Sequence, residues 1–206
     1  MVLPEPTSPP PTRLPGWPAM LAASAAVAAL AAAFTFVPWL HAHGMYLRHG
    51  VRFEGEWWRV LTSMWVHLGW KHYLADVAAT VGLLLLAGRV ARIREMLAVL
   101  VICGLVAQVA LLRMPAVGWY GGLSGAAHGL ALWTALRLLQ EAGWPRVIGV
   151  VIAVVVLGKV WTEQSWLAAL VFDPSWGFNV ARGAHAAGAM AGLGCWLLQE
   201  WWWRRQ

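Results

Sequence analysis

The feature that most constrains this chain is a series of long apolar runs, with the charged residues gathered in short segments between them. An α-helix needs about 20 consecutive apolar residues to cross the hydrocarbon core of a bilayer. Inside that core, backbone N–H and C=O groups must pair within the segment, and a helix satisfies this requirement. The pattern therefore predicts an all-α, polytopic membrane protein.

Composition supports this prediction. Of the 206 residues, 60% are hydrophobic and 12% are Asp, Glu, Lys or Arg, whereas soluble domains carry about 25% charged residues. Sixteen tryptophans fit a chain that meets membrane–water interfaces. The net charge of +6 does not indicate nucleic acid, because the arginines flank apolar runs. We expect the lipid bilayer as their partner.

Six spans are expected, forming a bundle of six transmembrane helices. The first, an uncleaved helix, is placed at about 18–40, and a polar, amphipathic segment at about 41–65 follows it. The other five are expected at about 71–86, 95–112, 123–140, 147–161 and 180–200. The domains are then a disordered, cytoplasmic, Pro-rich N-terminal tail (1–17), the six-helix membrane domain (18–200), and an aromatic and basic C-terminal tail (201–206).

The orientation follows from the arginines. They are dense in the turn at 89–94 and at the C-terminus, 204–205, and the positive-inside rule makes both segments cytoplasmic. Arg48, Arg52 and Arg59 then lie on the outer side, against the rule. In this topology the second, fourth and sixth helices all begin at the outer face.

Five polar side chains lie near the beginnings of those three helices: His72 and Asp76, Ser124 and His128, and His185. At a rise of about 1.5 Å per residue, each lies within roughly 10 Å of its helix start. Polar groups inside a membrane span are costly and usually functional. Their shared depth predicts a single site.

Ser124 lies in the segment Gly122-Leu123-Ser124-Gly125, at the expected start of a helix. Glycines on both sides allow a tight turn and the close approach of a substrate. The unpaired N–H groups and the positive dipole end at a helix start are ready donors for an oxyanion. Ser124 is therefore the candidate nucleophile.

The candidate base for Ser124 is His185. Residues 125–129 and 188–192 are both Gly-xxx-Gly patterns, which let two helices approach closely. Because no acidic residue in the sixth helix is placed to orient His185, we expect a Ser/His dyad.

Structural interpretations of the same residues remain open. His72 and Asp76 are one turn apart and could simply pair with each other. His128 could itself be the base, although it points poorly from the helix that carries Ser124. His185 could hydrogen-bond a neighbouring carbonyl.

Three segments, in order, resemble rhomboid proteases. The segment 55–63, followed by His67 and His72, resembles their first loop and second helix. The segment 122–125 resembles their Gly-x-Ser-Gly motif, and Ala184-His185 followed by Gly188 resembles their sixth helix. The resemblance covers about 55–197. It implies a six-helix rhomboid-like bundle with intramembrane serine protease activity.

Two finer features are similar to the rhombosortases. His128 stands one turn after Ser124, where other rhomboids often have tyrosine, and the segment 158–164 is similar as well. Rhombosortases process exported proteins whose C-terminus carries a Gly-Gly signal, an apolar span and a basic tail. The resemblance implies membrane-anchored substrates of that kind. It also implies a multi-pass protein of the bacterial inner membrane, with its active site open to the periplasmic side.

The resemblance implies residue roles. Ser124 would be the nucleophile and His185 the general base and acid, while His72 and the Ser124 N–H would stabilise the oxyanion. The resemblance also assigns Gly122, Leu123 and His128 to the residues that contact the oxyanion or the substrate. Asp76 stands where many rhomboids have asparagine. It could donate to the oxyanion if protonated, or it could hold His72 in place.

Several alternatives remain. The chain could be a general rhomboid protease of other transmembrane substrates, or a non-catalytic rhomboid-like protein that binds membrane clients. A zinc site or ion pathway could be built from His72, Asp76, His128 and His185, but no His-Glu-x-x-His motif is present. We expect no metal and no cofactor. Transfer of an acyl-enzyme to water or to an amine acceptor is left open.

Overall fold

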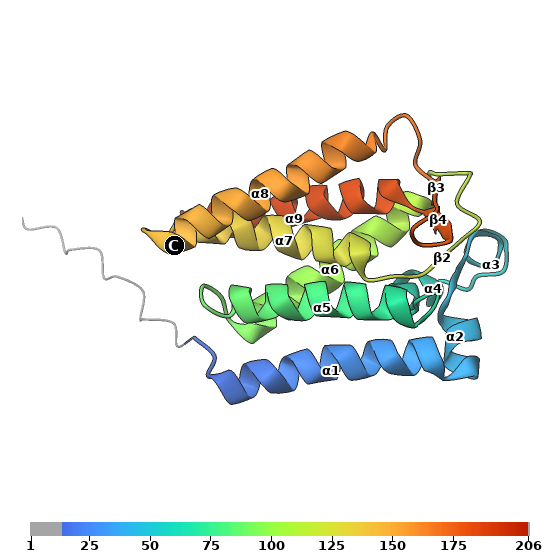
Figure 1. Ribbon diagram of the computed structural model, residues 1–206, viewed down its shortest axis with the longest axis horizontal. Helices are drawn as coiled ribbons and strands as arrows, with labels where there is room; N and C mark the ends of the chain where they lie inside the picture. Colours follow the sequence, from blue (N-terminus) through green and yellow to red (C-terminus); the bar gives the residue numbers. More distant parts are fainter. Residues whose placement is uncertain (1–13, 206) are drawn as a thin grey trace, which may run out of the picture.

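The computed structural model describes residues 14–205, and this part of the chain is mostly helical. Its long helices lie side by side (Figure 1). They are α1 (Trp17–Phe36), α5 (Trp70–Ala87), α6 (Ile93–Leu111), α7 (Ser124–Leu138), α8 (Trp144–Glu163) and α9 (Arg182–Trp203). Within the described residues, α1, α6 and α8 are long and apolar enough to cross a membrane.

Short elements fill the connections at one end of the bundle. Between α1 and α5 lie α2 (Pro38–Gly44), β1 (Tyr46–Leu47), α3 (Arg48–Phe53), α4 (Arg59–Thr62) and the 3-10 helix η1 (Ser63–Trp65). Strand β2 (Trp119–Tyr120) precedes α7, and β3 (Val171–Asp173) and β4 (Phe178–Val180) lie between α8 and α9. Strands β1 and β2 pair antiparallel, as do β3 and β4. The all-α prediction did not include these two small sheets.

Helix ends follow local chemistry. Pro38 stops α1 at Phe36 and begins α2, because a proline restricts the residue before it and lacks an N–H. The first helix is therefore shorter than the expected 18–40. Helix α8 ends at Glu163, and Gln164 after it has a left-handed backbone, with φ of 48°, a conformation typical of the residue that follows a helix.

The C-terminal segment differs from the expected division. Helix α9 continues to Trp203, so the three tryptophans assigned to a separate tail form its last turn. The predicted N-terminal tail, 1–17, falls largely on residues 1–13, which lie outside the described residues. Helix α1 begins at the last residue of that predicted tail, Trp17.

Helices α7 and α9 meet backbone to backbone. A Cβ added to Gly188 would overlap the carbonyl oxygen of Gly125, and one added to Gly192 would overlap that of Gly129. The two Gly-xxx-Gly patterns therefore form the contact that they predict. It brings the beginning of α9 close to the beginning of α7.

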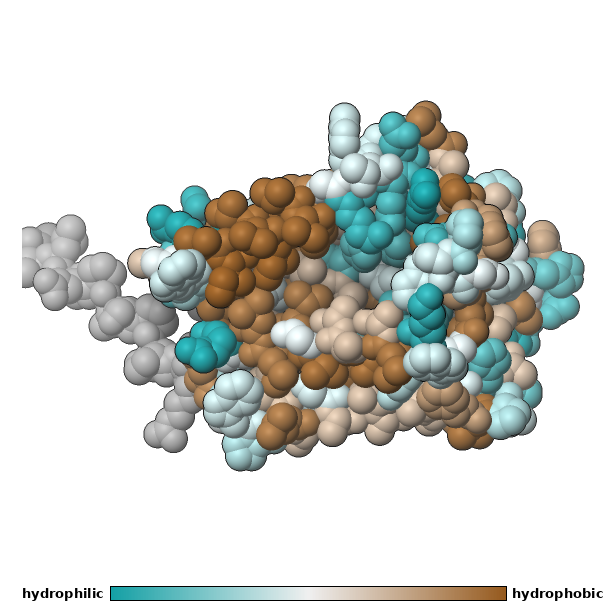
Figure 2. All heavy atoms as spheres, viewed as in Figure 1, coloured by the Kyte–Doolittle hydropathy of each residue, from teal (hydrophilic) through white to brown (hydrophobic). Residues whose placement is uncertain are grey.

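Helix α7 is the central element, with 11 of its 15 residues buried. Helix α8 is at the other extreme and exposes a row of valines, among them Val150, Val151, Val154 and Val155. Figure 2 shows this hydrophobic surface on α8, with hydrophilic residues at the two ends of the molecule. Such a face requires lipid as its solvent.

Helices α5, α7 and α9 begin at the same end of the bundle (Figure 1). The arginine-rich turn between α5 and α6 and the end of α9 lie at the opposite end. The alternation of helix directions that the sequence predicts is therefore present, and it gathers three helix N-termini around one site.

Candidate active site

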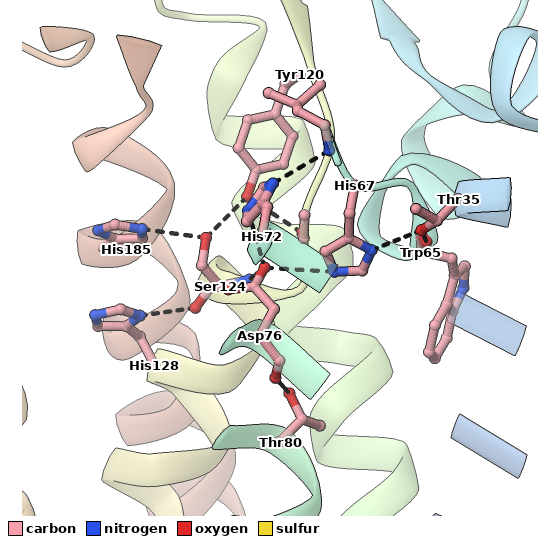
Figure 3. Close-up of polar contacts among 12 residues, drawn as sticks. Thr35, Trp65, His67, His72, Asp76, Thr80, Tyr120, Ser124, His128 and His185 are labelled. Atoms are coloured by element: carbon pink, nitrogen blue, oxygen red, sulfur yellow. Dashed lines mark hydrogen bonds and ion pairs between the residues drawn. The ribbon is translucent and has the colours of Figure 1, made fainter. Parts of the chain in front are cut away.

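A cavity of about 200 Å³ lies where α5, α7 and α9 begin, beneath β3 and β4. All five polar residues that the sequence places at one depth line it. Figure 3 shows them gathered in one place from three helices, α5, α7 and α9. Residues that the sequence analysis did not include in the site also line the cavity, among them Tyr120, Lys159, Glu163, Trp176 and Phe178.

Ser124 and His185 are in hydrogen-bonding contact. The Ser124 Oγ lies 3.1 Å from the His185 Nε2 (Figure 3). Ser124 is the first residue of α7, and His185 is buried in the first turn of α9. The close α7–α9 packing described above produces this distance, which suits proton transfer from a hydroxyl to an imidazole.

The other ring nitrogen of His185 contacts an acidic residue. Glu163 Oε2 lies 2.8 Å from His185 Nδ1. The expectation of an unassisted Ser/His dyad therefore needs revision, because a carboxylate from α8 contacts the ring. The sixth helix itself holds no acidic residue near His185, and Glu163 lies two residues beyond Trp161, the expected end of the fifth helix.

His128 is stacked on His185 and does not face the hydroxyl. The two rings lie 4.2 Å apart between centroids and are nearly parallel, at 9°. The His128 Nδ1 is 2.7 Å from the carbonyl oxygen of Ser124. Because a carbonyl only accepts, this nitrogen carries a proton and donates it. The geometry does not favour the alternative in which His128 is the base.

Asp76 accepts the backbone N–H of Ser124, with its Oδ2 3.1 Å from the nitrogen. The same oxygen lies 3.2 Å from His72 Nε2 and, in a longer contact, 3.5 Å from His67 Nε2. Leu68 donates its backbone N–H to His72 Nδ1, so the proton of that ring is on Nε2 and points at Asp76.

The two donors that the resemblance assigns to an oxyanion, the Ser124 N–H and His72, therefore both point at one Asp76 oxygen. This carboxylate oxygen occupies the position expected for the oxyanion of a reacting carbonyl. The pairing of His72 with Asp76, which the sequence left as one possibility, is present.

His67 connects this cluster to α1. It is fully buried, and its Nδ1 lies 3.0 Å from the Thr35 Oγ (Figure 3). The chain of contacts runs from Thr35 through His67 to Asp76. The first helix therefore supports the side of the site opposite His185.

Tyr120 is a site residue that the sequence analysis missed. Its hydroxyl donates to the Gly122 carbonyl at 3.3 Å and lies 3.4 Å from the Ser124 Oγ. Burial raises the pKa of Tyr120 to about 12, so its hydroxyl stays protonated at neutral pH. The pairing of Tyr46 with Tyr120 fixes its position, and no local motif in the sequence shows that pairing.

Gly122 and Leu123 shape the turn before Ser124. Gly122 has φ of 144°, and a Cβ there would lie 3.1 Å from the His72 ring. Only glycine fits both requirements. Leu123 is fully buried in the hydrophobic core, so its side chain contributes packing at the helix start and does not face the cavity.

Aromatic side chains form the outer wall of the cavity. Trp176 and Phe178 lie 5.9 Å and 5.0 Å from His72, between ring centroids. Lys71 donates to the Ser175 carbonyl at 2.6 Å, which ties the β3–β4 turn to the start of α5. Among residues 14–205, no three His, Cys, Asp or Glu side chains are grouped so that they could hold a metal ion.

The chain was compared with known proteins. A family model described as the Rhomboid domain matches residues 54–199, well over half of the chain. The matched residues run from before α4 to Gln199 in α9 and include every polar residue described in the cavity. No curated protein matches the chain.

Proposed function

This chain belongs to the rhomboid family, whose members are typically intramembrane serine proteases, and from that premise we propose that Ser124 is its nucleophile and His185 its general base. The observation that carries the proposal is the 3.1 Å contact between the Ser124 Oγ and His185 Nε2, within a cavity at one end of a helical membrane protein. A serine is a weak nucleophile unless a base accepts its proton.

The chemistry follows from this geometry. As the Ser124 Oγ attacks a peptide carbonyl, its proton moves to His185 Nε2 and the carbonyl oxygen becomes an oxyanion. The proton then moves to the leaving amine as the C–N bond breaks. Water then attacks the acyl-enzyme ester and gives a proton to His185 Nε2. The proton returns to the Ser124 Oγ as the C–O bond breaks and the acid is released.

We propose that two donors stabilise the oxyanion. They are the backbone N–H of Ser124, at the start of α7, and the Nε2–H of His72. Both face Asp76 Oδ2, so an incoming carbonyl oxygen must displace that carboxylate or share its donors. Each such donor is worth about 10²–10³ in rate in serine proteases.

For the substrate we propose an exported protein with a C-terminal Gly-Gly signal, an apolar span and a basic tail. Large rings, those of Tyr120, Trp176 and Phe178, line the small cavity and favour residues without side chains at the scissile bond. The chain would then lie in a bacterial inner membrane with this cavity open to the outer, periplasmic side.

The test is cleavage of a membrane-anchored reporter that ends in such a signal, co-expressed with the protein. Ser124→Ala and His185→Ala are each expected to leave the reporter uncut while the protein still inserts. Ser24→Ala, a buried serine in α1, is the matched control and should cut normally. Cleavage that survives Ser124→Ala would refute the proposed nucleophile.

The signal is tested separately. Replacing the reporter's Gly-Gly with Val-Val should abolish cleavage, because branched side chains would meet the aromatic wall. Equal cleavage of both reporters would leave a protease that acts on other transmembrane substrates. Failure of a serine-directed fluorophosphonate to label the wild-type protein at Ser124 would instead favour a non-catalytic, client-binding protein.

A further inference from the structure

Glu163 is the last residue of α8 and faces His185 on α9. Its Oε2 lies 2.8 Å from the His185 Nδ1, and both side chains are nearly buried, at 11% and 6% exposure. With the Ser124 contact on Nε2, three residues from three helices form a continuous chain of hydrogen bonds. This arrangement extends beyond the Ser/His dyad that the sequence predicted.

We propose that Glu163 is the positioning residue for His185, a proposal that rests on the proposed protease function. A carboxylate at this position accepts a hydrogen bond, so the proton of the neutral ring resides on Nδ1. Nε2 is then unprotonated and faces the Ser124 hydroxyl, as proton transfer requires. Without an acceptor at Nδ1, the ring would populate the other tautomer and rotate more freely.

The carboxylate itself is held from two sides. Lys159, one turn earlier on α8, donates to the other oxygen, Oε1, at 2.6 Å. Arg182, the first residue of α9, donates to the Glu163 backbone carbonyl at 3.0 Å. The end of α8 is thereby joined to the start of α9, and Oε2 remains free to serve His185.

The role in the reaction follows directly. When Nε2 takes the Ser124 proton, the ring becomes an imidazolium, and the adjacent negative carboxylate stabilises it. When Nε2 releases that proton to the leaving amine, the ring returns to its neutral form with its Nδ1 proton unchanged. Glu163 therefore keeps its negative charge throughout and touches neither the substrate nor the transferred proton.

The experiment compares Glu163→Gln, Glu163→Asp and Glu163→Ala with the wild type, each purified and reconstituted in lipid vesicles. Two rates are measured: cleavage of the Gly-Gly reporter, resolved into kcat and KM, and labelling of Ser124 by a fluorophosphonate. Glu141→Gln, an exposed glutamate in the α7–α8 connection at the far end, is the matched control. Lys159→Met removes the salt bridge but leaves the carboxylate in place.

Glu163→Gln is expected to lower kcat by about 100-fold or more with KM nearly unchanged, because an amide no longer specifies the tautomer. Glu163→Asp should recover a substantial part of the loss, since it restores the charge. Millimolar formate should partly restore cleavage by Glu163→Ala, because formate supplies the missing carboxylate. It would not do so if the role of Glu163 were purely structural. The control Glu141→Gln should stay within a few-fold of the wild type, and Lys159→Met should lose less activity than Glu163→Gln, because the carboxylate remains beside His185.

Several results would overturn the proposal. They are wild-type rates for Glu163→Gln, a loss confined to KM, or an equal loss in Lys159→Met, which would make the carboxylate only a helix-end anchor. If Glu163→Gln does not fold, the ¹⁵N spectrum of the wild-type protein shows which ring nitrogen of neutral His185 carries the proton. A proton on Nε2 would overturn the proposal. A wild-type protein whose Ser124 is neither labelled nor needed for cleavage would show instead that the proposed function has failed.

Discussion

At the scale of single residues, Asp76 is the side chain whose charge decides how the site works. Its Oδ2 accepts the Ser124 N–H and lies against His72, where an oxyanion would form. An ionised carboxylate there repels a developing negative charge, by about 4 kcal/mol for charges 4 Å apart at an effective dielectric constant of 20.

Asp76→Asn is therefore expected to react faster with a fluorophosphonate, by about tenfold or more, because the amide removes that charge and donates its own N–H. The rate of Ser124 labelling measures the effect. A loss of about 100-fold would contradict this expectation and show that the carboxylate is needed to hold His72.

Tyr120 offers a second test at the same scale. Its protonated hydroxyl supports the Gly122 carbonyl and approaches the Ser124 Oγ, so it orders the turn that carries the nucleophile. Tyr120→Phe should lower kcat by about fivefold, since one hydrogen bond is worth about 1 kcal/mol. Tyr73→Phe, which loses a hydrogen bond to the Ala28 carbonyl away from Ser124, should lower stability but not kcat.

At the scale of elements, the α7–α9 contact determines whether nucleophile and base meet. Gly188 and Gly192 leave no room for a Cβ against α7. Gly188→Ala should push the helices apart, cost about 1–3 kcal/mol of stability and lengthen the distance between Ser124 and His185. Both activity and the midpoint of thermal unfolding should fall.

Gly194→Ala is the matched control, because a Cβ there meets nothing and should slightly favour the helix. Wild-type cleavage by Gly188→Ala would show that the two helices can separate without cost to the chemistry.

The sequence predicts an element well when a local sequence signal, such as a long apolar run or a glycine or proline at its end, is present. Long apolar runs predicted where the six long helices lie, although only α1, α6 and α8 of the described helices are long and apolar enough to span a membrane. The alternation of helix direction gathered Ser124, His185 and Asp76 at one end. The end of α8 was not marked, because no glycine or proline follows Glu163 and the helix continues past its last apolar residue. The β1–β2 pairing that positions Tyr120 joins residues far apart in the chain, which local patterns cannot reveal.

At the scale of the whole molecule, two of the three arginines that oppose the proposed orientation take part in the fold. Arg59 is nearly buried, pairs with Glu56 and donates to three backbone carbonyls. Arg48 donates to two carbonyls at the end of α6. Both charges serve the fold, while the turn at 89–94 keeps its positive charge at the opposite end.

This orientation predicts where single cysteines react in a background without Cys103 and Cys195. In spheroplasts, whose inner membrane is still sealed, a membrane-impermeant maleimide should label Ser175→Cys, in the turn above the cavity. Glu141→Cys should be labelled only after the inner membrane is opened. The reverse pattern would place the cavity on the cytoplasmic side and contradict the proposed topology.

The exposed valine face of α8 has a further consequence. Glu163 ends this helix, whose outer surface is exposed where the other helices pack against protein, so in a membrane this surface would face lipid. The spacing between Glu163 and His185 therefore depends on lateral pressure and acyl-chain length as well as on packing. The bilayer should therefore affect the reaction rate. For the same protein, with no residue changed, turnover should vary with lipid chain length.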